Sequence, residues 1–218
     1  MQNNNLLKRA ILALLLCVAM PCLNAQVAHV GDILCEGNLI YPPSTYPVSG
    51  ATAIGVIFYV DDTGQHGWAV ALQDAGSYKW GMKDSDTPLP NYSSSSKRQA
   101  IYDLDGYTNT LIVRQHNANH PAFYAVDFEN GWYVPAIGQL NYLYSNIIEV
   151  NKSLSVAGGT KFSTSWTYWS STECNSIFAW FLKSSGDLAI GTSNNGGGYI
   201  SYYDHKDTAF RVRGVRNF

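Results

Sequence analysis

The chain has 218 residues and a formal net charge of −2, from 14 basic and 16 acidic residues. This balance lacks the excess of basic residues that marks nucleic-acid-binding domains, so it argues against a nucleic-acid partner. Aromatic residues form 13% of the chain, charged residues only 14%, and there are 19 glycines. Such a composition is typical of a turn-rich and strand-rich extracellular domain with a polar, largely uncharged surface.

Residues 1–25 have the pattern of a secretory signal peptide. Lys8 and Arg9 precede the apolar run 10–19, and the segment ends in a small residue that a signal peptidase accepts. The apolar run is well short of the ~20 residues that span a bilayer. We therefore expect cleavage after Ala25, export to the envelope surface, periplasm or exterior, and no transmembrane segment in the mature chain.

Two of the four cysteines, Cys35 and Cys174, remain after cleavage. An exported protein meets an oxidising compartment, so the simple expectation is one disulfide between them. The alternative is two separate buried thiols. Cys17 and Cys22 fall in the leader, and neither follows the Gly, Ala or Ser that lipoprotein processing prefers, which disfavours a lipid anchor.

Residues 26–218 are long enough for a single domain with a sizeable core. The first part reads as strands, because apolar and β-branched runs alternate with Gly and Pro breaks. A turn at 61–64, Asp-Asp-Thr-Gly, joins two of these runs into a β-hairpin. We expect residues 26–50 to form an N-terminal β extension. The expected strands of this part are 30–35, 39–41, 54–60 and 68–72.

A loop and helical patterns follow. The segment 81–99 is rich in Asp, Ser and Pro, so we expect an exposed loop. A short helix is expected at 107–115, where Thr and Asn are good capping residues, and another at 122–128. The main helix begins at Pro135 and ends near 149–152, because apolar residues recur there at three- and four-residue spacing. These apolar residues are Ile137, Leu140, Leu143, Tyr144 and Ile147.

The rest of the chain has a β pattern. Segments rich in Gly, Ser and Asn separate short apolar and aromatic runs, as in consecutive antiparallel strands. With helices before these strands, the sequence predicts an α+β fold with one or two helices plus antiparallel sheets. The expected strands are 177–182, 188–190, 199–203 and 208–215.

Three landmarks carry a resemblance to a known family: Trp-Tyr-Val-Pro at 132–135, Tyr-Trp-Ser-Ser-Thr at 168–172 and Val-Arg at 215–216. The chain resembles a family of bacterial exported domains of unknown function that share the C-type-lectin-like fold of formylglycine-generating enzymes. Its relatives include the C-terminal domain of collagen-like adhesins. The resemblance implies one C-type-lectin-like domain preceded by an N-terminal strand pair. An arginine often follows the family's tryptophan, where this chain has Tyr133.

The residues of these landmarks have a mainly structural interpretation. Trp132, Trp169 and Trp180 are expected in the core, because large apolar side chains in strand contexts are more often buried than ligand-binding. We expect the hydroxyls of residues 170–172, Ser-Ser-Thr, to bond neighbouring backbone groups and lock a turn, not to act as nucleophiles.

The sequence lacks the common catalytic motifs. It has no G-x-S-x-G elbow, P-loop, dinucleotide-binding glycine fingerprint or C-x-x-C. The oxidases that share the C-type-lectin-like fold use a pair of nearby cysteines. In this chain Cys174 has no neighbouring cysteine in sequence. We therefore expect a protein that is not an enzyme and has no cofactor.

Two patterns are candidates for a metal site, and both are weak. His116 and His120 have a four-residue spacing that suits a helix, but the Asn and Pro residues around them favour a loop. Residues 103–106, Asp-Leu-Asp-Gly, open like a calcium loop but lack its later acidic ligands, so a solvated turn is expected. The calcium motif of lectins is also absent, and we expect no metal site.

The segment 191–205 is the candidate recognition site. It combines amides and hydroxyls with tyrosines, a mixture that favours adaptable binding. The alternative is a glycine-loop hairpin whose tyrosines alternate between core and solvent. Because alternation places Tyr202 and Tyr203 on opposite sides of a strand, we assign Tyr202 to the exposed side and Tyr203 to the core. The candidate ligand-binding residues are Asn194, Asn195, Tyr199, Tyr202 and Asp204.

The favoured function is a secreted or surface-displayed, non-catalytic binding domain for a glycan or a protein partner in adhesion. The alternative is a structural subunit of a cell-envelope or fimbrial assembly.

Overall fold

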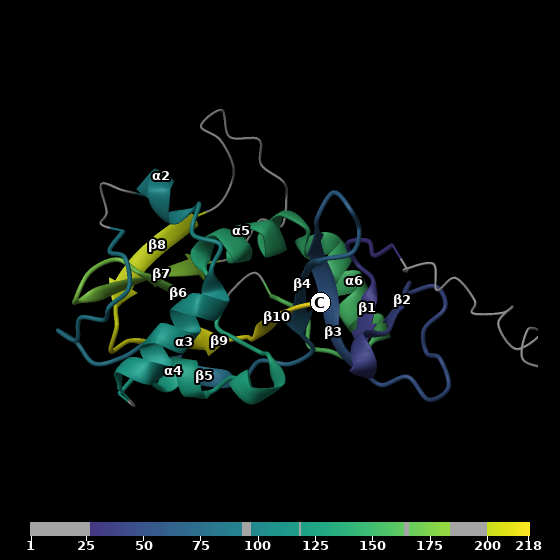
Figure 1. The fold of residues 1–218 in the computed structure, drawn as a ribbon, viewed down its shortest axis with the longest axis horizontal. Helices are drawn as coiled ribbons and strands as arrows, with labels where there is room; N and C mark the ends of the chain where they lie inside the picture. Colours follow the sequence, from purple (N-terminus) through teal and green to yellow (C-terminus); the bar gives the residue numbers. More distant parts are fainter. Residues whose placement is uncertain (1–26, 93–96, 118, 164–165, 184–199) are drawn as a thin grey trace, which may run out of the picture.

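The computed structural model describes residues 27–92, 97–117, 119–163, 166–183 and 200–218. In this part of the chain, two five-stranded sheets lie beside one another along the long axis of the molecule (Figure 1). The α+β class is confirmed. The expected signal peptide and the expected strand 188–190 lie outside the described residues.

The first sheet has the strand order β10-β4-β3-β1-β2, and every pair in it is antiparallel. The expected hairpin is confirmed as β3 and β4, and the strand pair before it as β1 and β2. A 3-10 turn, Glu36–Asn38, joins β1 to β2, and Gly37 allows its positive φ of 71°. The bounds are β1 Ile33–Cys35, β2 Ile40–Tyr41, β3 Ala53–Val60, β4 Gly67–Ala71 and β10 Val215–Asn217.

The second sheet has the order β5-β9-β6-β7-β8. Its neighbours are antiparallel except β6 and β9, which run parallel with Tyr168 opposite Arg211, so the expectation of purely antiparallel sheets is wrong here. The expected strand 208–215 divides into β9 and β10, which belong to different sheets. The bounds are β5 Gly76–Lys79, β6 Thr167–Glu173, β7 Phe178–Lys183, β8 Ile200–His205 and β9 Ala209–Val212.

Helices lie near the three expected positions, but α2 Lys97–Ala100 begins inside the expected loop 81–99 and α4 Pro121–Tyr124 ends before the expected residue 128. Two further corrections concern α3 and the main helix. Asp105 caps α3 by accepting the Thr108 N–H at 3.2 Å, so the capping residue lies before the expected ones. The expected main helix is two helices, because the Asn146 side chain donates to the Phe58 carbonyl of β3 at 3.0 Å and the backbone there leaves the helical region. The bounds are α2 Lys97–Ala100, α3 Gly106–His116, α4 Pro121–Tyr124, η3 Phe128–Asn130, α5 Ile137–Ser145 and α6 Ile147–Val156.

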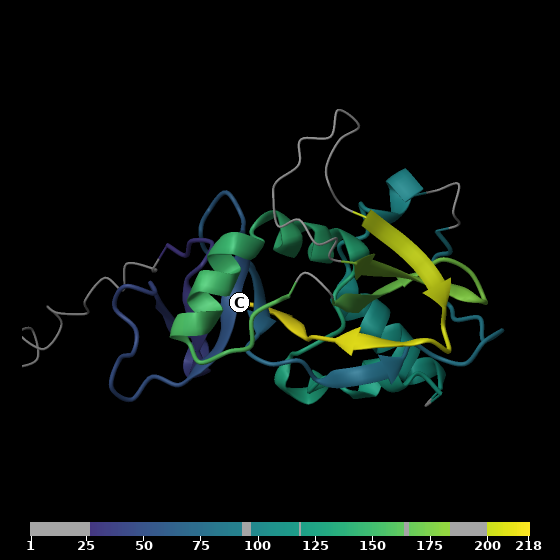
Figure 2. The same ribbon diagram turned by 180° about the vertical axis from the view of Figure 1, so that it is seen from behind.

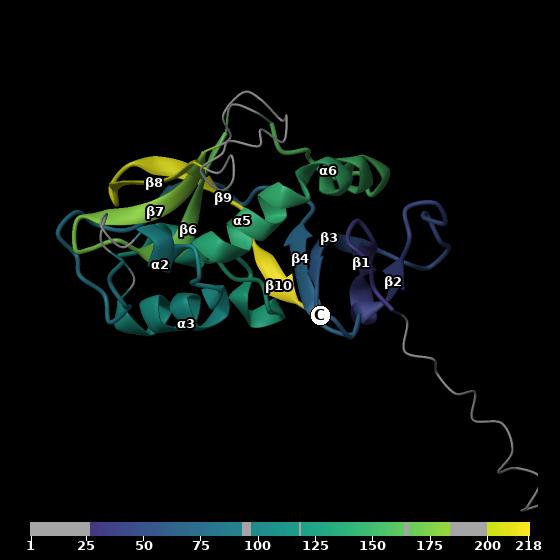
Figure 3. The same ribbon diagram turned by 90° about the horizontal axis from the view of Figure 1, so that it is seen from above.

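Helix α5 connects the cores of the two sheets. It contacts β3 of the first sheet and β6 and β7 of the second (Figure 3). Its buried residues include Ile137, Leu140 and Leu143, which confirms the expected apolar face. Trp169 and Trp180 are fully buried as expected, whereas Trp132 is only partly buried.

The segment between β5 and α2 is more buried than its composition indicates. Thr87 and Leu89 are both buried, as is Trp80 immediately after β5. The Trp80 indole N–H donates to the Ser170 carbonyl of β6 at 2.8 Å. The expectation of an exposed loop is therefore wrong at the centre of this segment, because Thr87 and Leu89 pack into the second sheet's side of the core.

Two connections join the sheets. β4 runs into β5 through residues 72–75, and β9 runs almost directly into β10, so each carries the chain from one sheet to the other (Figure 2). The two lie side by side. The Ala71 N–H donates to the Gly214 carbonyl at 2.9 Å, and the Ala75 N–H donates to the Val212 carbonyl at 2.8 Å. We call this pair of connections the joint.

Arg213 is the central side chain of the joint and is only 2% exposed. Its guanidinium donates to the carbonyls of Ala71 at 2.8 Å, Leu72 at 2.6 Å and Thr160 at 2.7 Å, and lies 3.6 Å from the Asp74 carboxylate. A planar guanidinium with five N–H donors can serve three carbonyls at once. Arg213 therefore fixes the end of β4 and the loop after α6 against the β9–β10 connection.

We expect Arg213→Ala to lower the free energy of unfolding by about 3–5 kcal/mol, because it leaves buried partners uncompensated. Arg213→Lys should recover only part of this loss, since one ammonium cannot match the guanidinium fork. The matched control is Arg216→Ala, three residues on and partly exposed, which should cost less than about 1 kcal/mol. Urea denaturation of all three variants measures these differences. Equal losses in Arg213→Ala and Arg216→Ala would contradict the role of Arg213.

Candidate functional site

Most of the expected recognition segment lies outside the described residues. This holds for Asn194, Asn195 and Tyr199, and for the side chain of Tyr202. Asp204 lies in β8, where its carboxylate accepts the His205 N–H at 2.6 Å.

The expectation that Tyr203 is the core-facing tyrosine is wrong. Its side chain is 42% exposed, and its ring lies edge-on against Trp180 and Phe178 at centroid distances of 5.5 and 5.4 Å. β8 is an edge strand of the second sheet. Tyr203 therefore contacts core aromatic rings from this edge strand while part of it stays exposed to solvent.

The expected disulfide is not formed in this structure. Cys35 ends β1 in the first sheet, and Cys174 directly follows β6 in the second; both are buried, and no bond joins them. Burial raises the pKa of the Cys35 thiol. The separate sheets explain the difference, because the sequence predicts the pairing only from the number of mature cysteines.

Asp103 has a structural role in place of the expected solvated turn. Its carboxylate accepts the Thr172 hydroxyl at 2.7 Å, the Asn109 amide at 2.9 Å and the Asp105 N–H at 3.1 Å. Asn109 also donates to the Ser171 hydroxyl at 3.2 Å. This buried network ties the start of α3 to β6 and uses the carboxylate oxygens that a calcium ion would need.

The Ser-Ser-Thr run bonds backbone groups, as expected, but from a strand and not from a turn. Ser170 donates to the Trp180 carbonyl of β7 at 2.7 Å. Thr172 accepts the Ile137 N–H at 2.9 Å and so satisfies a donor at the start of α5. The hydroxyls of β6 therefore position neighbouring elements.

His120 is buried beside Trp80 and stays neutral. Within the described part of the chain, neither of its ring nitrogens has a hydrogen-bond partner. Burial is the main cause that lowers the pKa of His120 to about 4, with Lys206 and His116 acting in the same direction. The nearby backbone of Asn117 acts to raise the pKa of His120, but it does not meet the distance and angle of a hydrogen bond to either ring nitrogen.

His120 and His116 have ring centroids 6.4 Å apart. No group of three potential ligands among His, Cys, Asp and Glu gathers anywhere in the residues that the structure covers.

A groove lies along the joint and is the best candidate for a binding site. It has an empty volume of about 750 Å³, including its open mouth. One wall comes from β3 and the β4–β5 connection, and the other from the segment between α4 and η3. Its lining residues are Ala53, Ile54, Ala71, Leu72, Gln73, Ala75, Ala125, Val126, Asp127, Trp132 and Gly214.

Trp132 is the aromatic side chain of this groove. It packs over Gly55 and Gly214, where a Cβ would lie 3.1 Å and 3.5 Å from the indole. The Arg216 guanidinium lies 5.6 Å from the centre of its ring. Asp127 adds a carboxylate to the lining and accepts the Asn130 amide at 2.7 Å. A partly exposed indole beside polar groups suits a sugar ring or a peptide side chain.

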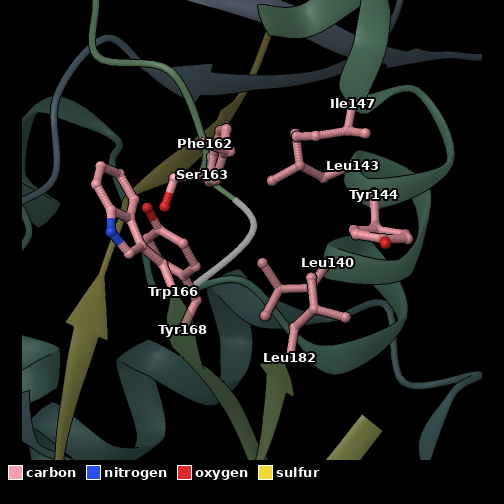
Figure 4. Close-up of a pocket in the computed structure, with 9 residues that line it drawn as sticks. All are labelled: Leu140, Leu143, Tyr144, Ile147, Phe162, Ser163, Trp166, Tyr168 and Leu182. Carbon is pink, nitrogen blue, oxygen red and sulfur yellow. The ribbon is translucent and has the colours of Figure 1, made fainter. Parts of the chain in front are cut away.

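A second hollow is apolar and lies between the α5–α6 helices and the second sheet (Figure 4). Tyr168, at its base, has its pKa raised by burial, and its hydroxyl donates to Asp74 at 3.1 Å. Arg211 stacks on Trp166 at 3.8 Å. The hollow offers few polar contacts, so it is part of the core. Its lining residues are Leu140, Leu143, Tyr144, Ile147, Phe162, Ser163, Trp166, Tyr168 and Leu182.

The sequence does not predict the groove. It predicts Trp132 in the core, and the other lining residues are mainly small or apolar. Trp132 packs over the glycines at 55 and 214, and only the folded chain brings these three residues together.

Among the described residues, no helix has both the length and the apolar character to cross a membrane.

Comparisons with known proteins find a likeness in fold. No family model matches the sequence, and no curated protein matches it. A solved structure with a similar fold is a fimbrial protein from Bacteroides ovatus, which shares 17% sequence identity at a TM-score of 0.64. The superposition covers 87% of this chain and 49% of that protein, so this chain spans about half of its length. At this identity, the likeness shows a shared fold.

Proposed function

We propose that this chain is a non-catalytic module of a fimbrial or other cell-envelope assembly. The observation that carries the proposal is the shared fold with a fimbrial protein over 87% of this chain. This reverses the order given by the sequence alone, in which adhesive binding came first and a structural subunit second. The C-type-lectin-like resemblance and the absence of catalysis stay predictions.

The polar interior supports a structural role. Asp103, Thr172 and Arg213 are buried, and each forms hydrogen bonds with neighbouring elements of the fold. Buried networks of this kind make a fold rigid when all their members are satisfied. The predicted signal peptide, residues 1–25, supplies the route to the exterior that such a module needs.

Fractionation of cells that produce the native chain tests this function. We expect the chain, cleaved after Ala25, to copurify with filaments sheared from the cell surface and to stay with them through a high-salt wash. A cytoplasmic enzyme serves as the control for lysis. Recovery of the chain only in the cytoplasm with residues 1–25 attached, or only as a free exported monomer, would contradict the proposal.

A second function, recognition of a glycan or a protein partner, is favoured by the groove along the joint. Trp132 and Asp127 combine an aromatic face with a carboxylate at an open site. In recognition surfaces, a few side chains, often Trp or Tyr, contribute most of the binding free energy. The predicted recognition segment, 191–205, remains the alternative location.

We expect Trp132→Ala to weaken retention of a ligand found by glycan and peptide arrays at least about tenfold, because it removes the groove's aromatic anchor. Trp166→Ala is a matched control: this tryptophan is also partly buried and also lies beside an arginine, but outside the groove. Surface plasmon resonance on both variants gives the comparison. Unchanged binding by Trp132→Ala, or an equal loss in both, would place recognition elsewhere.

A further inference from the structure

A buried ion pair closes the far end of the second sheet. Glu173 is the last residue of β6, and Lys206 directly follows β8. Both side chains are fully buried, and the Lys206 ammonium contacts the Glu173 carboxylate through Oε1. No step of the proposed function uses this pair.

The surroundings exclude water and hold each atom of the pair. Lys206 Nζ donates to the Ser85 carbonyl at 2.6 Å and lies 4.7 Å from the centre of the Trp80 ring. On the other side, the Thr87 hydroxyl donates to Glu173 Oε2 at 2.8 Å. The two carboxylate oxygens are thus distinct, since Oε1 faces the amine and Oε2 faces the hydroxyl.

The site disfavours charge on both partners. Burial raises the pKa of the Glu173 carboxyl and lowers the pKa of the Lys206 ammonium, while the bond between them acts against both shifts. An ion pair in such a place carries a large desolvation cost. Proton transfer from Nζ to Oε1 removes both charges and leaves an amine and a carboxylic acid in contact. A desolvated, neutral lysine is a good nucleophile.

We propose that Lys206 and Glu173 condense to an intramolecular amide bond between Nζ and Cδ. This inference is independent of the proposed function. The nucleophile and the electrophile belong to the same chain and are held together by packing, which gives an intramolecular reaction a high effective concentration.

The reaction balances without any further reagent. The Nζ lone pair forms the bond to Glu173 Cδ, and negative charge develops on Oε2, where the Thr87 hydroxyl stabilises it as an oxyanion hole would. The Cδ–Oε1 bond then breaks, and its electron pair leaves with Oε1. That oxygen already holds the proton first taken from Nζ and receives a second from Nζ, so one water molecule departs. No atom is oxidised or reduced.

A surface pair in the same chain shows why burial matters. Lys152 and Glu149 also form an ion pair, at 2.7 Å, but their side chains are 65% and 57% exposed. Water solvates both charges there, so neither partner has a reason to become neutral. This pair is the internal control, and we expect it to remain unlinked.

Peptide mapping of the folded full chain by mass spectrometry tests the proposal. Trypsin should fail to cleave after Lys206, and peptide 184–211 should appear joined to peptide 162–183, lighter than their sum by the mass of one water. The intact chain should show the same deficit. Lys206→Met and Glu173→Ala should each have the full mass expected from their sequence.

The wild-type map decides the matter even if the variants fail to fold. Recovery of peptides that end at an unmodified Lys206 from fully folded protein would overturn the proposal, and so would loss of water at the Lys152–Glu149 pair in place of this one. A chain purified in denaturant directly after synthesis, before it has folded, should lack the bond. A water deficit already present in that sample would also overturn it, because the bond would then not depend on burial.

Discussion

The arrangement of the two sheets depends on one buried guanidinium. Arg213 serves the carbonyls of Ala71, Leu72 and Thr160, which belong to the end of the first sheet and to the loop after α6. A buried cation is tolerated only when its donors are met, so these partners are fixed relative to the β9–β10 connection that carries Arg213. The groove is lined by residues of the joint, so its shape depends on how Arg213 fixes these connections. Trp132 reaches the groove from the other wall and packs over Gly55 and Gly214.

The second sheet is reinforced at both ends. Arg213 directly follows the end of β9, where the chain leaves for the first sheet, and the Lys206–Glu173 pair lies before the start of β9, where β8 finishes. Between them, the hydroxyls of β6 position the starts of α3 and α5 through Asp103 and Thr172. In the described part of the chain, these buried polar side chains therefore stabilise the architecture by joining separate elements.

Local patterns predicted much of the fold, and long-range contacts account for what they missed. The β3–β4 hairpin and the apolar face of α5 follow from residues close in sequence, and both are correct. Arg213 bonds Ala71 from 142 residues away, and Thr172 bonds Asp103 from 69 residues away, so no periodicity reveals either contact. For the same reason the sequence predicts a solvated turn at Asp103, whereas the structure places Asp103 in a buried network. The candidate site is less predictable than the fold. Small residues from several elements line the groove, and of its lining only Trp132 is a residue type that sequence patterns single out.

Native-state hydrogen exchange at the joint tests the central claim, that the two sheets form one rigid unit. The Ala71 and Ala75 amides cross the joint to Gly214 and Val212, whereas the Ile57 amide bonds Asp32 inside the first sheet. If the joint is rigid, the Ala71 and Ala75 amides should exchange only through global unfolding, with the same opening free energy as Ile57. Exchange of the two joint amides through a local opening of much lower free energy, while Ile57 stays protected, would show that the sheets move independently.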